Sequence, residues 1–184
     1  MSRSRRPDRE AERHRGRIRS IAFWVSTVVV LAELVAGSVW NLATIDWVEM
    51  QMSHLGYPHF FAYVLGACHV AAAAAIIAPG FGRLKDWAYA GTVLMWLGAV
   101  VSHLTTGDSV VSWGPPLMFA VLALTSWALR PADRRRDGRP ATHLRAWAVP
   151  IGLLAALYAV SILTLPAAED VTREWPAKRG WISE

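Results

Sequence analysis

Five long apolar stretches alternate with polar or basic segments along the chain. A helix needs about 20 mainly apolar residues to cross the hydrocarbon core of a bilayer. The first stretch covers about residues 20–42, and later ones cover about 59–77, 87–104 and 144–165. A further span starts after Pro115–Pro116, which suit the first turn of a helix, and ends near Leu129. The pattern predicts an all-α protein, a polytopic membrane helical bundle.

Residues 1–19 form a polar segment with eight arginines in front of the first apolar stretch. Such a segment resembles the start of a secretory signal peptide. The apolar stretch is, however, longer than a signal peptide's and lacks an A-x-A cleavage pattern. We therefore interpret it as a retained signal anchor that forms the first span. Residues 1–19 are expected to be a disordered, basic cytoplasmic tail.

Basic residues fall in every second segment between the spans. The tail, the loop with Arg83 and Lys85, and the loop at 132–143 are basic, whereas the loops that contain Asp46 and Asp108 have no Lys or Arg. Cytoplasmic loops carry an excess of Lys and Arg. The protein is therefore expected in the cell (inner) membrane, with a cytoplasmic N-terminus and an extracytoplasmic C-terminus.

These boundaries divide the chain into five predicted parts. They are a basic cytoplasmic tail at 1–19, a four-helix membrane core at 20–131, a basic cytoplasmic loop at 132–143, a fifth transmembrane helix at 144–165 and an extracytoplasmic tail at 166–184. The composition is 54% hydrophobic with a net charge of +5. Membrane topology accounts for the excess of arginine, so we expect the lipid bilayer as a partner and no nucleic acid.

Cys68 is the single cysteine of the chain. A single cysteine excludes an intrachain disulfide, a CxxC redox pair and a cysteine-rich zinc cluster. Any redox chemistry would therefore need an external cofactor or the thiols of a partner.

Two ionisable residues near the middle of the first two spans are the strongest candidates for chemistry. At about 1.5 Å per residue, Glu33 lies roughly 20 Å from the cytoplasmic end of its span. An unpaired ionisable side chain is costly in a bilayer, and desolvation favours the neutral form of Glu33. His69 lies at a similar depth in the next span, and consecutive spans usually pack together. We predict Glu33 and His69 as a catalytic, proton-handling pair. The alternatives are a polar contact that fixes helix packing and two residues that never meet.

Aromatic and polar residues at helical spacing accompany this pair. Trp40 and Asn41 follow Glu33 on one face of the first span. Tyr89, Trp96 and His103 share a face of the third span, and Asp108 follows in the next loop. The predicted substrate-binding residues are Trp40, Asn41, Tyr89, Trp96, His103 and Asp108. Ordinary helix packing, and a Gly-Asp turn for Asp108, are the alternatives.

Two histidines within spans suggest haem, whose two axial ligands must lie at similar depth on facing helices. His69 and His103 differ in depth by roughly 10 Å, which disfavours haem. No span has a His and a carboxylate at i, i+4 spacing, so no metal site is predicted. The residues alone leave the cofactor unassigned.

Several short motifs follow one another in the order typical of DoxX-like membrane proteins. They are Gly37, Leu55-Gly56-Tyr57-Pro58, Trp87-Ala88-Tyr89-Ala90-Gly91, Ser102-His103 with Gly107-Asp108, and Ser126 with Arg130-Pro131. The chain resembles this family over about residues 20–131. The resemblance implies a DoxX-like four-helix core, here with a fifth helix added. In the wider DoxX/DoxD group it also implies an association with quinone-linked sulfur oxidation or thiol-stress complexes.

Two departures from the family pattern bear on function. Members often have a lysine near the position of His69, so the chemistry here is expected to differ. The fifth span and the segment Ala167–Glu184 lie beyond the usual four-helix unit. We expect them to supply a lid or a contact with a partner.

Three functions stay open at this point. The first is an accessory or redox-associated subunit that binds a membrane or soluble oxidoreductase, or a quinone-like lipophilic molecule. The second is a membrane-embedded enzyme, of isomerase or cyclase type, in which Glu33 is the general acid. The third is a proton-coupled transporter with a stepped path through Glu33, His69 and His103, which the lack of an internal repeat disfavours. We favour the first, because no strong catalytic motif is visible.

Overall fold

Helices form all of the regular structure in the part of the chain that the computed structural model describes, residues 5–131 and 144–181. The long helices are α1 (Arg5–Ala43), α3 (Phe60–Ile77), α4 (Gly82–Thr105), α5 (Val110–Leu129) and α7 (Leu144–Leu163). The shorter ones are α2 (Asp46–His54), α8 (Leu165–Thr172) and α9 (Trp175–Lys178). All 5 long helices are apolar and long enough to cross a membrane. The predicted polytopic helical bundle is therefore confirmed.

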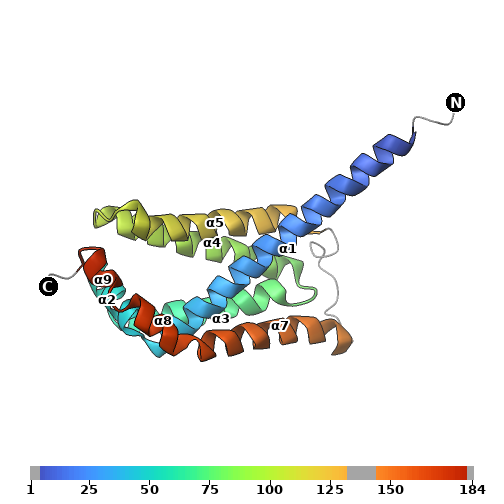
Figure 1. Cartoon of the computed structure of the whole chain (residues 1–184). Helices are drawn as coiled ribbons and strands as arrows, with labels where there is room; N and C mark the ends of the chain where they lie inside the picture. Colours follow the sequence, from blue (N-terminus) through green and yellow to red (C-terminus); the bar gives the residue numbers. More distant parts are fainter. Residues whose placement is uncertain (1–4, 132–143, 182–184) are drawn as a thin grey trace.

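Helix α1 is the central element of the bundle and packs against α3, α5 and α7 (Figure 1). It begins at Arg5 and runs for 39 residues, until Thr44 adopts a left-handed backbone with φ of 48°. The prediction of a disordered tail up to residue 19 is wrong from Arg5 onward, and residues 1–4 lie outside the described residues. The segment is rich in Arg and Glu, which favour helix. Its single proline, Pro7, lies in the first turn, where a missing N–H is tolerated.

The core lies where α1, α3, α4 and α5 meet. Its buried side chains include Val30, Leu31 and Leu34 of α1, Ile76 of α3, Trp96 of α4 and Ala123 of α5. The opposite faces of these helices carry exposed apolar side chains such as Leu94 and Val121. Helices that are apolar on all sides are typical of membrane spans, because lipid rather than water covers the outer face.

Two glycines let α1 and α3 approach closely. A Cβ at Gly66 would lie 2.7 Å from Cγ of Leu42, and a Cβ at Gly37 would lie 2.9 Å from Nε2 of His69. Both distances are too short for real atoms, so a side chain at either position would push the helices or side chains apart. Each glycine therefore leaves room for a side chain of the facing helix, Leu42 at Gly66 and His69 at Gly37.

Helix α5 begins before its proline pair. The prediction that the fourth span starts after Pro115–Pro116 is wrong, because α5 starts at Val110 and both prolines lie inside it. Ser109, with an extended backbone, precedes the first turn. Each proline removes one backbone hydrogen bond from the helix. Both prolines lie on the wall of a cavity.

Helices α2, α8 and α9 form a layer across one end of the bundle, away from the N-terminus (Figure 1). None of these three helices was predicted. Ile45, Trp47, Val48 and Met52 around α2 are buried against Ala62, with Trp175 and Trp181 packed beside them. Helix α7 occupies the segment predicted as the fifth span and packs on α1, where Ser38 donates a hydrogen bond of 3.1 Å to the Tyr158 hydroxyl.

Candidate functional site

A cavity of about 580 Å³ lies between α1, α3, α4 and α5, beside the layer formed by α2 and α9. Much of its wall is aromatic or apolar, with Trp40, Phe61 and Phe119 as examples. Polar side chains on the wall are Glu33, Asn41, Gln51, His69, Ser102, His103, Ser112 and Arg179. An apolar wall with a few convergent polar groups is typical of small-molecule sites.

The cavity brings together most of the residues that the sequence analysis singled out. Those on its wall are Glu33, Trp40 and Asn41 of α1, His69 of α3, and Trp96 and His103 of α4. Tyr89 and Asp108 lie outside the wall. The catalytic and binding roles of all eight residues stay predictions.

Glu33 and His69 share the cavity without bonding to each other. No hydrogen bond or ion pair joins the Glu33 carboxyl to another residue within the described ranges. His69 is 7% exposed, and its Nδ1 lies 2.7 Å from the carbonyl oxygen of Leu65, one turn earlier in α3. Its Nε2 lies close to Gly37, one turn after Glu33 in α1. The two helices therefore place both groups on the same cavity, where a bound molecule could contact them together.

Asn41 is held by its own helix. Its Nδ2 donates a hydrogen bond of 2.7 Å to the carbonyl oxygen of Gly37. This bond orients the side-chain amide on the cavity wall, next to Trp40. The amide oxygen stays an acceptor with no partner among the described residues, so it is available to a ligand.

Tyr89 belongs to a packing contact at the other end of α4. Its hydroxyl lies 2.7 Å from Oγ of Ser126, and Oγ1 of Thr27 lies 2.7 Å from the same atom. All three residues are buried. The three hydroxyls therefore join α4, α5 and α1 inside the bundle. Tyr89 shares a helix face with Trp96, as predicted, but it lies about two turns away from the cavity residues at Trp96 and beyond.

Asp108 lies in the turn between α4 and α5 and accepts hydrogen bonds from four side chains. His103 Nδ1 donates over 2.7 Å, His54 Nε2 over 3.1 Å, and Thr106 Oγ1 over 3.1 Å. The indole Nε1 of Trp181 donates to Oδ1 over 2.9 Å. Because a carboxylate only accepts, both histidines carry a proton on the nitrogen that faces it. His103 Nε2 is then an acceptor, and Gln51 donates to it over 3.2 Å.

The charge state of Asp108 follows from these contacts. Burial disfavours its charged form and by itself raises its pKa. The hydrogen bonds from His103, Trp181, His54 and Thr106 act in the other direction and outweigh burial, and they bring the pKa of Asp108 to about 2. The carboxyl is therefore ionised at neutral pH and acts as the anchor of this cluster.

Helix α9 and the residues after it lie at one end of the cavity. The Trp181 ring stacks on the His54 ring, with 4.6 Å between the ring centroids, and on the Trp47 ring, with 4.9 Å between the centroids. The guanidinium of Arg179 lies over the same Trp47 ring at 4.7 Å. Arg179 and Trp175 also form part of the cavity wall. We call Trp175, Arg179 and Trp181 the cap.

Sequence reasoning predicted a lid or partner contact from this segment but missed Gln51, His54 and the individual cap residues as parts of the site. Their partners lie far away along the chain, so no local spacing identifies them. A signal was nevertheless present, because two tryptophans in a short polar segment after the last span are uncommon unless their rings pack against something. The expectation of a lid or partner contact came only from the position of this segment beyond the four-helix unit.

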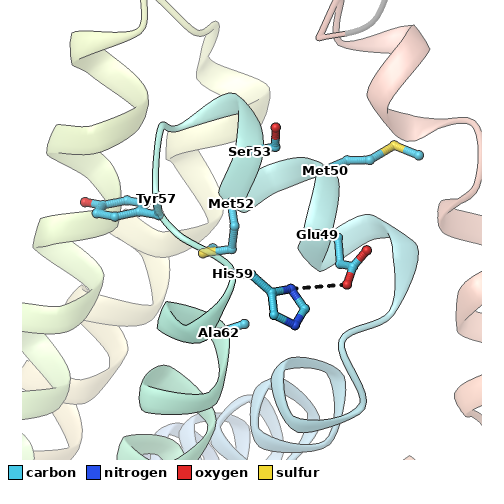
Figure 2. A pocket seen from close by; sticks show the side chains of 7 residues that line it. All are labelled: Glu49, Met50, Met52, Ser53, Tyr57, His59 and Ala62. Atoms are coloured by element: carbon cyan, nitrogen blue, oxygen red, sulfur yellow. Dashed lines mark ion pairs between the residues drawn. The ribbon is translucent and has the colours of Figure 1, made fainter.

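A second, shallower pocket of about 430 Å³ lies beside α2, at its junction with α3 (Figure 2). Glu49 and His59 form an ion pair of 3.3 Å there, with side chains 49% and 58% exposed. Exposed pairs of this kind contribute little energy because solvent screens them. In the described part of the chain, no group of three or more His, Cys, Asp or Glu side chains could hold a metal ion.

Comparison with known proteins gives one match. The DoxX-like family matches residues 25–126. This segment includes α2, α3, α4 and most of the membrane part of α1 and α5. No curated protein and no solved structure matches the chain.

Proposed function

The chain belongs to the DoxX-like family of multi-span membrane proteins, and we propose that it binds a lipophilic small molecule in the cavity between α1, α3, α4 and α5. The family resemblance predicted from the sequence motifs is confirmed. In the proposed role the protein is an accessory, redox-associated subunit, which holds the molecule within the bilayer for an oxidoreductase partner.

The observation that carries this proposal is the cavity itself. Its volume of about 580 Å³ falls within the range of about 300–1,000 Å³ that small-molecule sites usually have. Glu33 and His69 lie on its wall without bonding to each other, and polar groups at this depth are costly unless something contacts them. A ligand with an apolar body and a polar head would cover the aromatic wall and satisfy these groups together.

A quinone-like lipid fits this cavity. Flat rings pack well against Trp40, Trp96 and Phe119, and the oxygens of the head group can bond with side chains on the wall. Ser112 Oγ is a suitable donor, because the side chain is 4% exposed and has no hydrogen-bond partner among the described residues. When bound, such a lipid would supply two-electron redox chemistry, and the residues named here would bind and orient it.

The test uses two glycines of α4, of which one lies on the cavity wall and the other does not. A Cβ at Gly98 or at Gly91 meets no atom within 4 Å. Gly98 lies on the cavity wall, whereas Gly91 does not. Gly98→Leu adds a side chain at the cavity wall, and Gly91→Leu, which adds the same side chain away from that wall, is the matched control. Both proteins are purified gently from native membranes, and bound small molecules are identified by native mass spectrometry.

We expect a lipophilic molecule with the wild-type protein and with Gly91→Leu, and its loss from Gly98→Leu. If no molecule accompanies any of the three, or if Gly98→Leu retains it fully, the cavity is not a ligand site. Identification of the molecule as a quinone would also support the redox-associated role.

A second candidate function rests on the carboxyl of Glu33. This group has no partner among the described residues, and Trp40 and Trp96 lie on the same wall. A neutral Glu33 could protonate a double bond or epoxide of a lipophilic substrate, and the two indole rings could stabilise the resulting cation. Return of a proton from the cation to the Glu33 carboxylate would complete an isomerisation or cyclisation and restore the acid.

Glu33→Gln tests this second function. The amide keeps the size of the side chain but cannot donate an acidic proton. If the bound molecule is a substrate, wild-type protein converts it and Glu33→Gln binds it unchanged. Equal conversion by both proteins would exclude Glu33 as the general acid.

A further inference from the structure

The hydrogen bond at Nδ1 of His69 determines whether Nε2 can donate or accept a hydrogen bond with a ligand. Nδ1 lies 2.7 Å from the carbonyl oxygen of Leu65. A carbonyl oxygen can only accept, so Nδ1 carries a proton. A charged imidazole at this depth would need an ion-pair partner, and none is found for His69 among the described residues. The ring is therefore neutral, and Nε2 has a lone pair that can accept a hydrogen bond.

Nε2 of His69 lies beside Gly37, at the wall of the cavity. His69 and Gly37 are both part of the cavity wall. Only a glycine at position 37 leaves room for the ring, because a Cβ there would lie 2.9 Å from Nε2. No described side chain donates to Nε2. The amide oxygen of Asn41, whose Nδ2 is occupied by the Gly37 carbonyl, is a second acceptor nearby.

We propose that the ligand is a lipophilic alcohol or phenol whose hydroxyl donates a hydrogen bond to His69 Nε2. This inference rests on the proposed lipophilic site and deepens it. A molecule with only ether or carbonyl oxygens offers His69 an acceptor, and two acceptors that face each other repel. For a quinone-like lipid, the site therefore prefers the dihydroxy form to the dicarbonyl form.

Ser112 supports a ligand that makes more than one polar contact. Its hydroxyl lies on the α5 wall of the same cavity, is more than nine-tenths buried and bonds to no described residue. A buried hydroxyl without a partner is costly. The oxygen of a second polar group on the ligand would satisfy it while the first hydroxyl contacts His69.

The test compares two probes of nearly the same shape, 4-octylphenol and its methyl ether, 4-octylanisole. Binding of each to the full chain in lipid nanodiscs is measured by displacement of a fluorescent lipophile, with Gly98→Leu as the blocked control. We expect the phenol to bind about tenfold more tightly, as for the loss of one hydrogen bond to a buried acceptor. In His69→Phe, which keeps a ring but has no acceptor, the two affinities should become similar.

Gly37→Ala provides a second variant in case His69→Phe does not fold. The added methyl group forces the His69 ring to move, so the preference should weaken while His69 itself is retained. The outcomes separate the two proposals. If wild-type protein binds both probes equally and Gly98→Leu blocks both, the lipophilic site stands and the role of His69 fails.

If a preference for the phenol persists in both His69→Phe and Gly37→Ala, another residue accepts the hydrogen bond from the hydroxyl and the inference is overturned. If neither probe binds in a manner that Gly98→Leu blocks, the inference and the proposed function fail together. A preference for the methyl ether would contradict the inference directly.

Discussion

The indole Nε1 of Trp181 donates a hydrogen bond of 2.9 Å to Oδ1 of Asp108, although the two residues are 73 positions apart in the sequence. The bond fastens the segment after the last span to the turn between α4 and α5. Because Trp175 and Arg179 of the same segment line the cavity, this bond holds the cap over the end of the cavity.

Trp181→Phe removes this bond but keeps an aromatic ring for stacking on His54 and Trp47. Since one hydrogen bond to a charged group contributes about 1.5–3 kcal/mol, the cap should open more than about tenfold more often. Hydrogen–deuterium exchange of the α8–α9 peptide measures this opening. Trp87→Phe is the control, because Trp87 is 77% exposed. Unchanged exchange in Trp181→Phe would show that stacking alone holds the cap.

The attachment of the cap should weaken at acid pH. The pKa of Asp108 is about 2, below its usual 3.8. A carboxyl whose pKa is lower in the folded state stabilises that state above its unfolded pKa, and the stabilisation is lost as the pH falls through the folded pKa. Cap attachment, followed by tryptophan fluorescence, should therefore be lost between about pH 4 and pH 2.

Asp108→Asn should weaken the cap already at neutral pH and remove most of this acid transition. Asp170→Asn is a suitable control, because Arg173 is the only partner of Asp170 among the described residues and both side chains are 75% exposed. If Asp108→Asn keeps the same acid transition as the wild type, another group controls the cap.

The buried hydroxyl contact among Thr27, Tyr89 and Ser126 should stabilise the bundle. Ser126→Ala leaves the other two hydroxyls without their common partner, and such interhelical bonds contribute about 0.6–1.7 kcal/mol in membranes. We expect a lower melting temperature in detergent. Thr125→Ala, at the neighbouring position in α5, is the control, because the described bond of the Thr125 hydroxyl goes to the carbonyl of Val121 in its own helix. Equal melting temperatures for the two variants would contradict a structural role for this contact.

The orientation in the membrane is a further prediction, from the basic residues near the N-terminal end of the bundle. In a Cys68→Ala background, Gly16→Cys places a thiol on the arginine-rich end of α1, and Ser53→Cys places one on α2. Both positions are exposed. In intact cells a membrane-impermeant thiol reagent should label only Ser53→Cys. Labelling of Gly16→Cys instead would reverse the proposed orientation.

The spans could be predicted because the bilayer imposes length and apolarity on each helix separately. The similar depth of Glu33 and His69 could also be anticipated, since counting residues along two adjacent spans gives their depths. Both line one cavity, although no described bond joins them. The start of α5 could not be predicted, because prolines are typical of the first turn of a helix, whereas Pro115 and Pro116 lie inside α5. The roles of His54, Gln51 and Trp181 could not be predicted. Their contacts depend on how α2 and the cap pack over the bundle, and no local sequence pattern indicates that packing.

Helix α1 is longer than a membrane is thick. Its 39 residues extend about 58 Å at 1.5 Å per residue, against about 30 Å for the hydrocarbon core. The exposed arginines from Arg13 to Arg19 and the turn that carries Glu33 belong to one unbroken helix. About 21 Å of helix separates Arg19 from Glu33. Where lipid phosphates bind these arginines, the fixed length of helix between Arg19 and Glu33 also sets how far below the head groups the Glu33 carboxyl lies.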